Sequence, residues 1–423
     1  MYQILTNFIT LLFKQMNPSA TGWINRYLVE YEQDLQELSD YSFEAFYHEL
    51  KKVGFIYGTN LIPVSQRKND DFKLTQEELA KVNLFTALSI VYFHHNHKKN
   101  NALCLKTIIA FYAKLKRTHQ SLFQFKWLSK SKPDREVESI LHQRVQTNDS
   151  YLQKNFSNIV TNALLFVDVL AFKNYLNDIY EPCWFATRLE EMLVNSLYLA
   201  LKEKKLKGKY DKIIIKLIQS SLRYHEIKVD NIKAIEDLNF EILKTKTEKI
   251  YLIDMMCMTL YSDEVIDESE KDFIVKLSES LNISIQDLNH SIQFLYDFVN
   301  ENKSEIYYFN SAHPVKYFYD RTYRTLSLLV VRNKKRIINE ISQSKELMNL
   351  LMISSYRELN SNERRKVKTQ LLDIFKTIPS LAIFALPGGS LLLPIVIKMI
   401  PSILPSSFNE NLKKDYTQKE KKI

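Results

Sequence analysis

The sequence predicts an all-α protein: multi-helix bundle domains followed by a proline-kinked helical segment at the C-terminal end. Glycine is scarce, with only 6 in 423 residues, and folds that need many tight turns or glycine-rich loops use more. Apolar residues make up 45% of the chain and charged residues 25%, which is the composition of a folded protein. Apolar side chains also recur at helical spacing, as at Tyr27, Leu28, Tyr31, Leu35 and Leu38.

Two helical blocks come first. The first predicted domain covers residues 1–128, and a polar run separates it from a second block at 135–240. The second block contains the apolar run 159–172, which is interrupted by Asn162 and Asp168. A run of about 14 residues is too short to span a bilayer, so we expect a buried core helix here.

The net charge and the cysteine positions indicate which partners the protein favours and whether its cysteines are reduced. The net charge is +9 and the pI is near 9.0, so acidic partners such as anionic lipid or RNA are favoured, without a choice between them. Cys104, Cys183 and Cys257 lie far apart in apolar surroundings, as reduced core residues do. The N-terminal apolar stretch lacks the basic residues and cleavage site of a signal peptide, so we expect an amphipathic first helix.

Residues 245–310 are predicted to form a distinct helical unit with an acidic turn. Six acids fall between residues 263 and 272, and Asp263, Asp267 and Glu270 are weak candidates for a metal site. The spacing of Asp267 and Glu270 is that of a capping box, which accounts for the acids better, and an EF-hand loop is absent. The apolar helix, the turn at Asp263 and the later Glu270 together resemble the TerB-like helical domain of tellurite resistance, with Glu264 where that family has glycine.

A basic segment follows at residues 316–336, with seven basic residues and one acid. Aromatic side chains lie between the cations, a pattern that suits contact with RNA or with anionic lipid headgroups. A core-facing helix with a solvated basic side would give the same pattern, and the sequence leaves both interpretations open. The candidate basic patch comprises Arg321, Arg324, Arg332, Lys334, Lys335 and Arg336.

The C-terminal segment carries the strongest pattern. From Thr377 to Ile397 there are 21 residues without a charge; as a helix these would cover roughly 30 Å, about one hydrocarbon core. A Pro-Gly-Gly break at the middle would kink the helix or fold it into a hairpin, and basic residues on both sides give no orientation. We therefore predict a membrane-associated segment at 377–404, spanning or re-entrant, with a buried soluble helix as the alternative and a basic tail at 409–423. Its marker residues are Pro379, Pro387, Gly388, Gly389, Pro394, Lys398, Pro401 and Pro405.

The residues around this segment follow a recognisable order. Leu359 precedes Glu363-Arg364, then come Asp373-Ile-Phe375 and finally Leu404-Pro-Ser-Ser-Phe408. Over 316–408 the chain thus resembles the LETM (leucine-zipper/EF-hand-containing transmembrane) family, in which Leu-Thr-x-x-Glu-Arg leads through Asp-x-Phe to a membrane helix ending in Leu-Pro-Ser-x-Phe.

The resemblance implies a membrane protein of a family tied to cation/proton exchange and to ribosome binding. The family's EF-hand and leucine zipper have no counterpart in this sequence. No ionisable residue lies between Thr377 and Ile397 to carry a proton or a cation, which favours an anchor over a transporter. Short bacterial relatives of this type look like cell-surface or biofilm-associated accessory proteins, so the resemblance implies such a role here.

Motifs of enzymes are missing from the sequence. There is no GxGxxG, GxxxxGK[ST], HExxH, CxxC pair or GxSxG, so we expect neither enzymatic activity nor a cofactor. His94, His95 and His97 form the only histidine cluster, and at the end of an apolar helix they complement its dipole.

Three functions stay open at this stage. The first is a non-enzymatic, membrane-associated accessory, regulatory or interaction protein at the bacterial cytoplasmic membrane, with most of the chain in the cytoplasm. The second is a component of cation/proton homeostasis, and the third a ribosome- or RNA-binding protein. The expected partner is membrane lipid, with ribosome or RNA and a homo-oligomer as alternatives; no small-molecule substrate is indicated.

Overall fold

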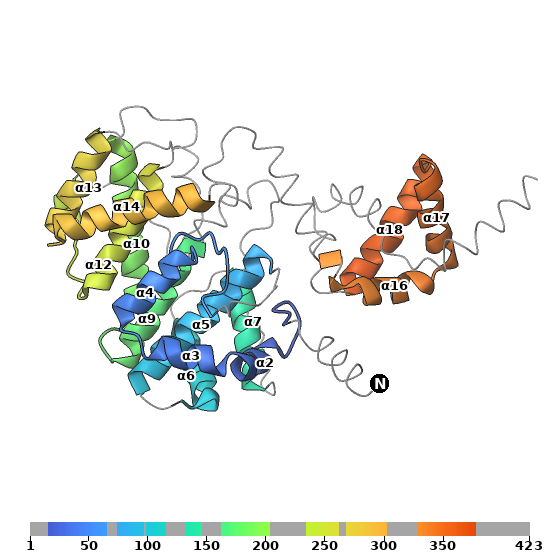
Figure 1. Cartoon of the computed structure of the whole chain (residues 1–423), viewed down its shortest axis with the longest axis horizontal. Helices are drawn as coiled ribbons and strands as arrows, with labels where there is room; N and C mark the ends of the chain where they lie inside the picture. The colour runs from blue at the N-terminus through green and yellow to red at the C-terminus, as the bar shows by residue number, and fades with distance from the viewer. Residues whose placement is uncertain are drawn as a thin grey trace, which may run out of the picture. The chain divides into compact units, whose positions relative to one another are not determined.

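The computed structural model describes residues 16–65, 74–96, 99–115, 132–145, 162–203, 234–261, 268–302, 329–330 and 332–377. These residues form fourteen α-helices and one short 3-10 helix, and none of them lies in a strand. The predicted all-α class is therefore confirmed. The chain divides into two compact units, one made of residues 1–148 and 153–312 and the other of 149–152 and 313–423, and Figure 1 draws both.

The first unit is a bundle of long and short helices. In chain order these are α2 (Trp23–Glu30), α3 (Glu32–Ser39), α4 (Phe43–Lys52), α5 (Gln76–Asn96), α6 (Asn101–Leu115), α7 (Pro133–Val145), α9 (Leu165–Leu176), α10 (Pro182–Glu203), the 3-10 helix η2 (Ile235–Asp237), α12 (Lys246–Leu260), α13 (Glu268–Ser280) and α14 (Ile285–Asn302).

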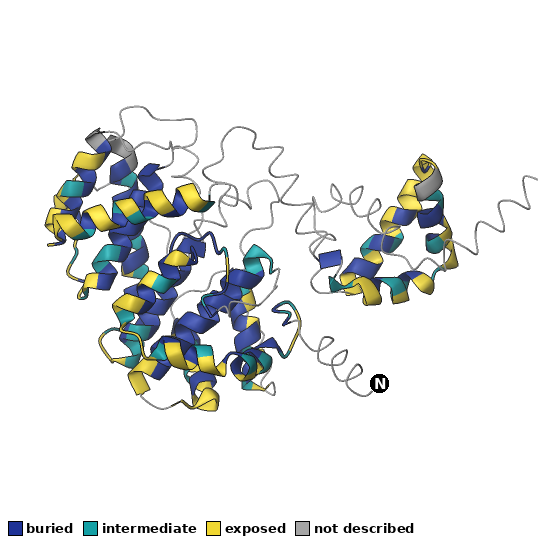
Figure 2. Ribbon diagram, viewed as in Figure 1, coloured by how far each residue is buried: buried dark blue, intermediate teal, exposed yellow. Residues whose placement is uncertain are grey.

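Three helices of this unit are buried around most of their circumference. Every residue of α5 from Glu78 to Phe93 is buried, and α9 and α12 are buried almost as completely. Helices α3, α6 and α7 pack against α5, while α4, α10, α13 and α14 pack against α12. Figure 2 shows exposed residues on covering helices such as α3 and α14. A helix that is apolar on all sides needs such covering on all sides.

The predicted segments 1–128, 135–240 and 245–310 contribute to one hydrophobic core. The apolar run 159–172 is predicted to form a buried helix, and its described part from Asn162 to Phe172 is buried, which confirms that prediction. The three cysteines are buried as well. No helix among the described residues is long and apolar enough to cross a bilayer.

Asp168 places a carboxylate in the first turn of buried α9. Arg144 of α7 donates through Nε to Asp168 Oδ2 at 2.7 Å, and the Tyr112 hydroxyl of α6 donates to the same oxygen at 3.0 Å. The arginine side chain is 10% exposed and the aspartate 0%. A buried charge without a partner is strongly destabilising, so α6 and α7 are held to α9 by this requirement.

Asp254 likewise places a buried carboxylate in α12, where it holds a covering helix. Lys51 Nζ lies 2.9 Å from Asp254 Oδ1, and the Tyr47 hydroxyl donates to Oδ2 at 2.6 Å. Burial and the neighbouring carboxylate raise the pKa of Tyr47 well above its ordinary value, so this hydroxyl stays a donor. Both partners come from α4, which is thereby fixed on α12.

A tight turn after α4 brings the chain back toward α5. Gly54 has φ +79°, and a Cβ there would lie 2.7 Å from the Thr59 carbonyl oxygen. Asn83 of α5 holds the turn because its Nδ2 donates to Asn60 Oδ1 at 2.8 Å and its Oδ1 accepts from the Val64 amide at 2.8 Å. Only glycine fits a left-handed residue with so close a neighbour.

The second unit contains three described helices around a separate core. They are α16 (Lys334–Ser342), α17 (Lys345–Tyr356) and α18 (Ser361–Thr377), and each packs on the other two. Ile337, Leu351, Val367 and Phe375 are fully buried between them. This unit lies within the predicted LETM-like region, 316–408.

We expect Asp168→Asn to destabilise the first unit by about 3–5 kcal/mol, because it removes the buried carboxylate charge that faces the Arg144 guanidinium. All three tryptophans of the chain (Trp23, Trp127 and Trp184) belong to the first unit, so tryptophan fluorescence during urea unfolding measures this unit alone. The control is Asp272→Asn on the exposed side of α13. Equal unfolding midpoints for the two variants would contradict the role given to Asp168.

Gly54→Ala should lower the free energy of unfolding more than Gly22→Ala does. Both glycines have positive φ, at +79° and +91°, so each substitution costs about 1–2 kcal/mol of backbone strain. Only at Gly54 does the new methyl group also meet backbone atoms; at Gly22 nothing lies within 4 Å. The same fluorescence measurement checks this order, and a larger loss in Gly22→Ala would show that the turn is not tightly packed.

Candidate functional site

The second unit begins α18 with a reciprocal hydrogen-bonded cap. The Asn360 side-chain oxygen accepts from the Glu363 amide at 2.9 Å, and a Glu363 carboxylate oxygen accepts from the Asn360 amide at 2.9 Å. This is a capping box, with asparagine at the N-cap and glutamate at the third helical position. The Asn360-Ser-Asn-Glu363 spacing is the sequence signal for this cap, which was not among the features predicted from the sequence.

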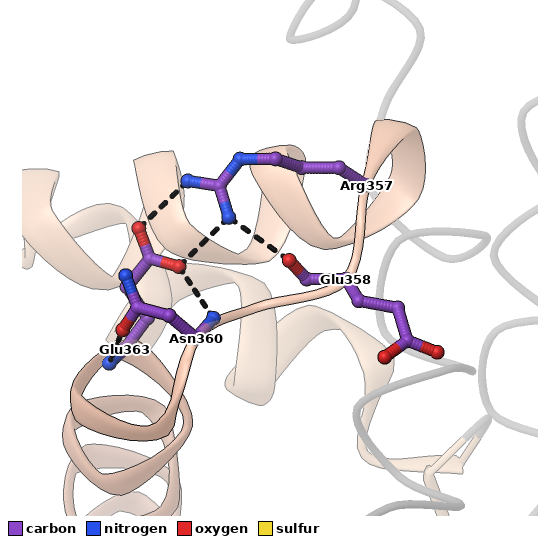
Figure 3. A network of polar contacts seen from close by, with 4 residues as sticks. All are labelled: Arg357, Glu358, Asn360 and Glu363. Carbon is purple, nitrogen blue, oxygen red and sulfur yellow. Dashed lines mark hydrogen bonds and ion pairs between the residues drawn. The ribbon is translucent and has the colours of Figure 1, made fainter.

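Arg357, in the loop before α18, donates hydrogen bonds to the carboxylate of Glu363 (Figure 3). Its two terminal nitrogens lie 2.9 and 2.7 Å from the two oxygens of Glu363, and one of them also donates to the Glu358 carbonyl at 2.9 Å. These bonds, first those from Arg357 and then that from the Asn360 amide, lower the pKa of Glu363 to about 2. The two-pronged contact fixes the direction in which α18 leaves the loop.

Contacts along the helices hold α17 against α18. Lys366 Nζ lies 2.6 Å from one oxygen of Glu346, and Gln370 donates to the other at 3.0 Å. Ser344 caps α17 by accepting from the Leu347 amide, and it donates to Gln370 Oε1 at 2.8 Å. The acids of this unit are therefore largely engaged in holding the helices together.

The described part of the second unit is strongly basic. Residues 329–377 contain 11 Lys and Arg against 5 Asp and Glu. Four of these acids pair with a cation: Glu346 with Lys366, Glu358 with Arg364, Glu363 with Arg357 and Asp373 with Lys376. Six other cations of this unit form no ion pair with an acid among the described residues. They come from α16, α17 and α18, and we call them together the basic face: Lys334, Lys335, Arg336, Lys345, Arg365 and Lys368.

Three members of the basic face occupy an electrostatically unfavourable position. Lys334, Lys335 and Arg336 are exposed and open α16, whose first turn has no acid. Cations at a helix N-terminus oppose the helix dipole, which favours anions there. These side chains therefore do not stabilise the first turn of α16, and an external anion would be attracted to them.

Arg336 also ties this turn to the end of α18. Its Nη2 donates to the carbonyl oxygen of Thr377 at 3.1 Å, one of the last carbonyls of the helix, which lack intrahelical partners. The three cations thus lie at the end of α18 from which the uncharged stretch continues.

The predicted site residues fall partly within this unit. Of the predicted basic patch, Arg332, Lys334, Lys335 and Arg336 are described, and the last three lie on the basic face; Arg321 and Arg324 are outside the described residues. The membrane segment after Thr377 is also outside them, with Pro379, Pro387, Gly388, Gly389, Pro394, Lys398, Pro401 and Pro405.

The weak metal candidates are not tested as a group. Asp263 and Asp267 lie outside the described residues, while Glu270 is 2% exposed on α13. Within the described ranges no three His, Cys, Asp or Glu side chains are arranged to hold a metal ion. His94 and His95 are exposed at the end of α5, and His97 lies outside the description.

Comparison with known families gives a match at the C-terminal end of the chain. Residues 359–423 match a family model described as LETM1-like, RBD. This part of the chain is therefore similar to the LETM1-like family. The match begins at Leu359, which is buried beside the capping box, and it supports the LETM resemblance inferred from the sequence. No solved structure matches the chain.

The structure gives the motif residues of this resemblance a physical role. Leu359 and Phe375 enter the small core at 6% and 0% exposure, Glu363 completes the cap, and Arg364 pairs with Glu358 at 2.9 Å. The motif around Glu363 thus builds the start of α18 and leaves the basic face available for contacts.

Acid should loosen the start of α18, and Glu363→Gln should do so at neutral pH. Because the pKa of Glu363 is lowered to about 2, its contribution is complete above its ordinary value of 4.5 and is lost as the pH falls toward 2. In hydrogen exchange, amides in the first turn of α18 should lose about fivefold in protection in the variant at pH 7. Glu340→Gln on α16 is the control, and an unchanged protection factor in Glu363→Gln would contradict the role of the cap.

Proposed function

We propose that this chain is a non-enzymatic, membrane-associated protein of LETM type whose second unit presents its basic face to an anionic membrane surface. The observation that carries the proposal is the hydrogen bond from Arg336 to the Thr377 carbonyl. It holds the cations of α16 at the point where the 21-residue uncharged stretch begins. An apolar segment and a basic cluster at one place are what a membrane surface with anionic headgroups attracts.

The expected electrostatic free energies favour a role of the basic face in binding to an anionic membrane. Each Lys or Arg close to an anionic leaflet is worth about 1 kcal/mol, so Lys334, Lys335 and Arg336 together supply about 3 kcal/mol, roughly a hundredfold in affinity. Arg365 and Lys368 lie on one exposed stripe of α18, because residues three apart share a helix face.

The proposal also assigns the protein a cellular location and gives the first unit a role. The protein would lie at the bacterial cytoplasmic membrane with the bulk of the chain in the cytoplasm, as an accessory or interaction protein of the cell envelope or of biofilm. The TerB-like part, 245–310, would act within the first unit as an interaction module, and a homo-oligomer is compatible with this arrangement.

Vesicle flotation tests the membrane surface contact. The purified full chain is mixed with vesicles of phosphatidylcholine containing about one third phosphatidylglycerol at physiological salt, where exposed charges act only within roughly 8 Å. The variant Lys334→Glu/Lys335→Glu/Arg336→Glu should bind these vesicles at least tenfold more weakly than the unaltered chain. The matched control, Lys106→Glu/Lys271→Glu/Lys276→Glu, changes charge equally at exposed positions of the first unit and should bind normally.

Two results would oppose the proposal. Equal binding by the two triple variants would mean that the basic face does not meet the lipid. Failure of the full chain to float with either anionic or pure phosphatidylcholine vesicles would remove the membrane association itself. A cation-dependent proton flux in sealed vesicles would instead support the alternative of cation/proton homeostasis.

A ribosome is the second candidate partner, favoured by the similarity of residues 359–423 to a family described as LETM1-like, RBD. The same cations would then meet ribosomal RNA, whose phosphates attract Lys and Arg. Sedimentation of the full chain with purified ribosomes distinguishes the two. Co-sedimentation that falls steeply with salt and is lost in the α16 triple variant would support it, and absence from the ribosome pellet at low salt would exclude it.

A further inference from the structure

The first unit has a pocket that the proposed function does not use. Its lining residues come from the beginning of α4 and the ends of α5 and α9, and its volume is about 350 Å³. Small-molecule sites in proteins measure about 300–1,000 Å³. At about 30 Å³ for each non-hydrogen atom, the volume of a water molecule in the liquid, this pocket holds roughly ten such atoms.

The floor of the pocket is apolar and belongs to the rigid core. Phe46, Ile90 and Val91 line it and are 1%, 2% and 4% exposed. Phe43 and Leu176 add apolar walls and are themselves packed against the core. A ligand body in this pocket would therefore replace water over apolar surface, which is favourable.

The rim carries nitrogen donors from two helices. His94 and His95 come from the last turn of α5, and Lys173 comes from the last turn of α9. Cations at helix C-termini complement the helix dipoles, but this does not explain why they converge over an apolar pocket.

Lys173 is the group that points to a ligand. Its Nζ lies 4.4 Å from the centre of the Phe43 ring, and it makes no ion pair among the described residues. Burial lowers the pKa of Lys173, while the charges of Glu248 and Glu44 act in the opposite direction. The contrast is Lys51, which is buried against aromatic rings and has Asp254 as its partner at 2.9 Å, whereas Lys173 is only half-buried.

We propose that this pocket binds a small organic anion with an apolar body, such as an aliphatic or aromatic carboxylate of roughly eight to ten non-hydrogen atoms. The acidic head lies on the Lys173 ammonium and accepts hydrogen bonds from the His94 and His95 rings. The body covers Phe46, Ile90 and Val91.

Calorimetric titration of octanoate tests the site. The full chain is reconstituted in phosphatidylcholine nanodiscs, and the heat of titrating empty nanodiscs is subtracted. Octanoate should bind saturably, with one site for each chain and at least tenfold more tightly than octylamine, which has the same body and the opposite charge. Lys173→Met should weaken octanoate binding at least tenfold.

The matched control is Lys114→Met. Lys114 also places its ammonium on an aromatic ring, 4.7 Å from the centre of the Tyr175 ring, but it does not line the pocket. Octanoate affinity should be unchanged in this variant. A second variant, His94→Ala/His95→Ala at exposed positions, weakens binding without disturbing the core. No saturable binding, tighter binding of octylamine, or equal effects of Lys173→Met and Lys114→Met would each overturn the proposal.

Discussion

Two carboxylates buried at the centre of the first unit set the positions of the helices around them. Asp168 and Asp254 are both 0% exposed, and each receives one cation and one tyrosine hydroxyl from covering helices. Moving a carboxylate out of water costs several kcal/mol unless its partners are well placed. A slip of α4 along α12, or of α7 along α9, would leave a charge unsatisfied, so these contacts select one packing among the many that an apolar interface alone would allow.

The second unit relies on the same kind of contact in a smaller core. The double hydrogen bond between Arg357 and Glu363 fixes where α18 begins, and the buried face of Val367, Leu371 and Phe375 then determines its course. At the other end Arg336 meets Thr377. Because the acids are used in these internal contacts, the basic face is left without internal counter-charges, and the chemistry of the surface follows from the way the unit is held together.

The sequence was informative where the determining residues are close together along the chain. The all-α class followed from glycine scarcity and helical spacing, and the burial of α9 followed from the length of the apolar run at 159–172. The partners of Asp168 could not be inferred, because Tyr112 and Arg144 lie 56 and 24 residues away. The pocket shows the same limit. His94 and His95 are adjacent in the sequence, whereas Lys173 lines the same pocket only because α5 packs on α9. The polar run before 135 suggested a domain boundary, yet the helices on both sides share one core.

The contact between Arg336 and Thr377 also has a mechanical meaning. Chain beyond Thr377 is joined to α18 by covalent bonds, and α18 is joined to α16 by this hydrogen bond and to α17 by its buried face. Separating the end of α18 from the small unit therefore requires breaking both attachments. The donor of the hydrogen bond lies in the first turn of α16, beside the exposed Lys334 and Lys335, so displacement of the end of α18 would alter the surroundings of these cations.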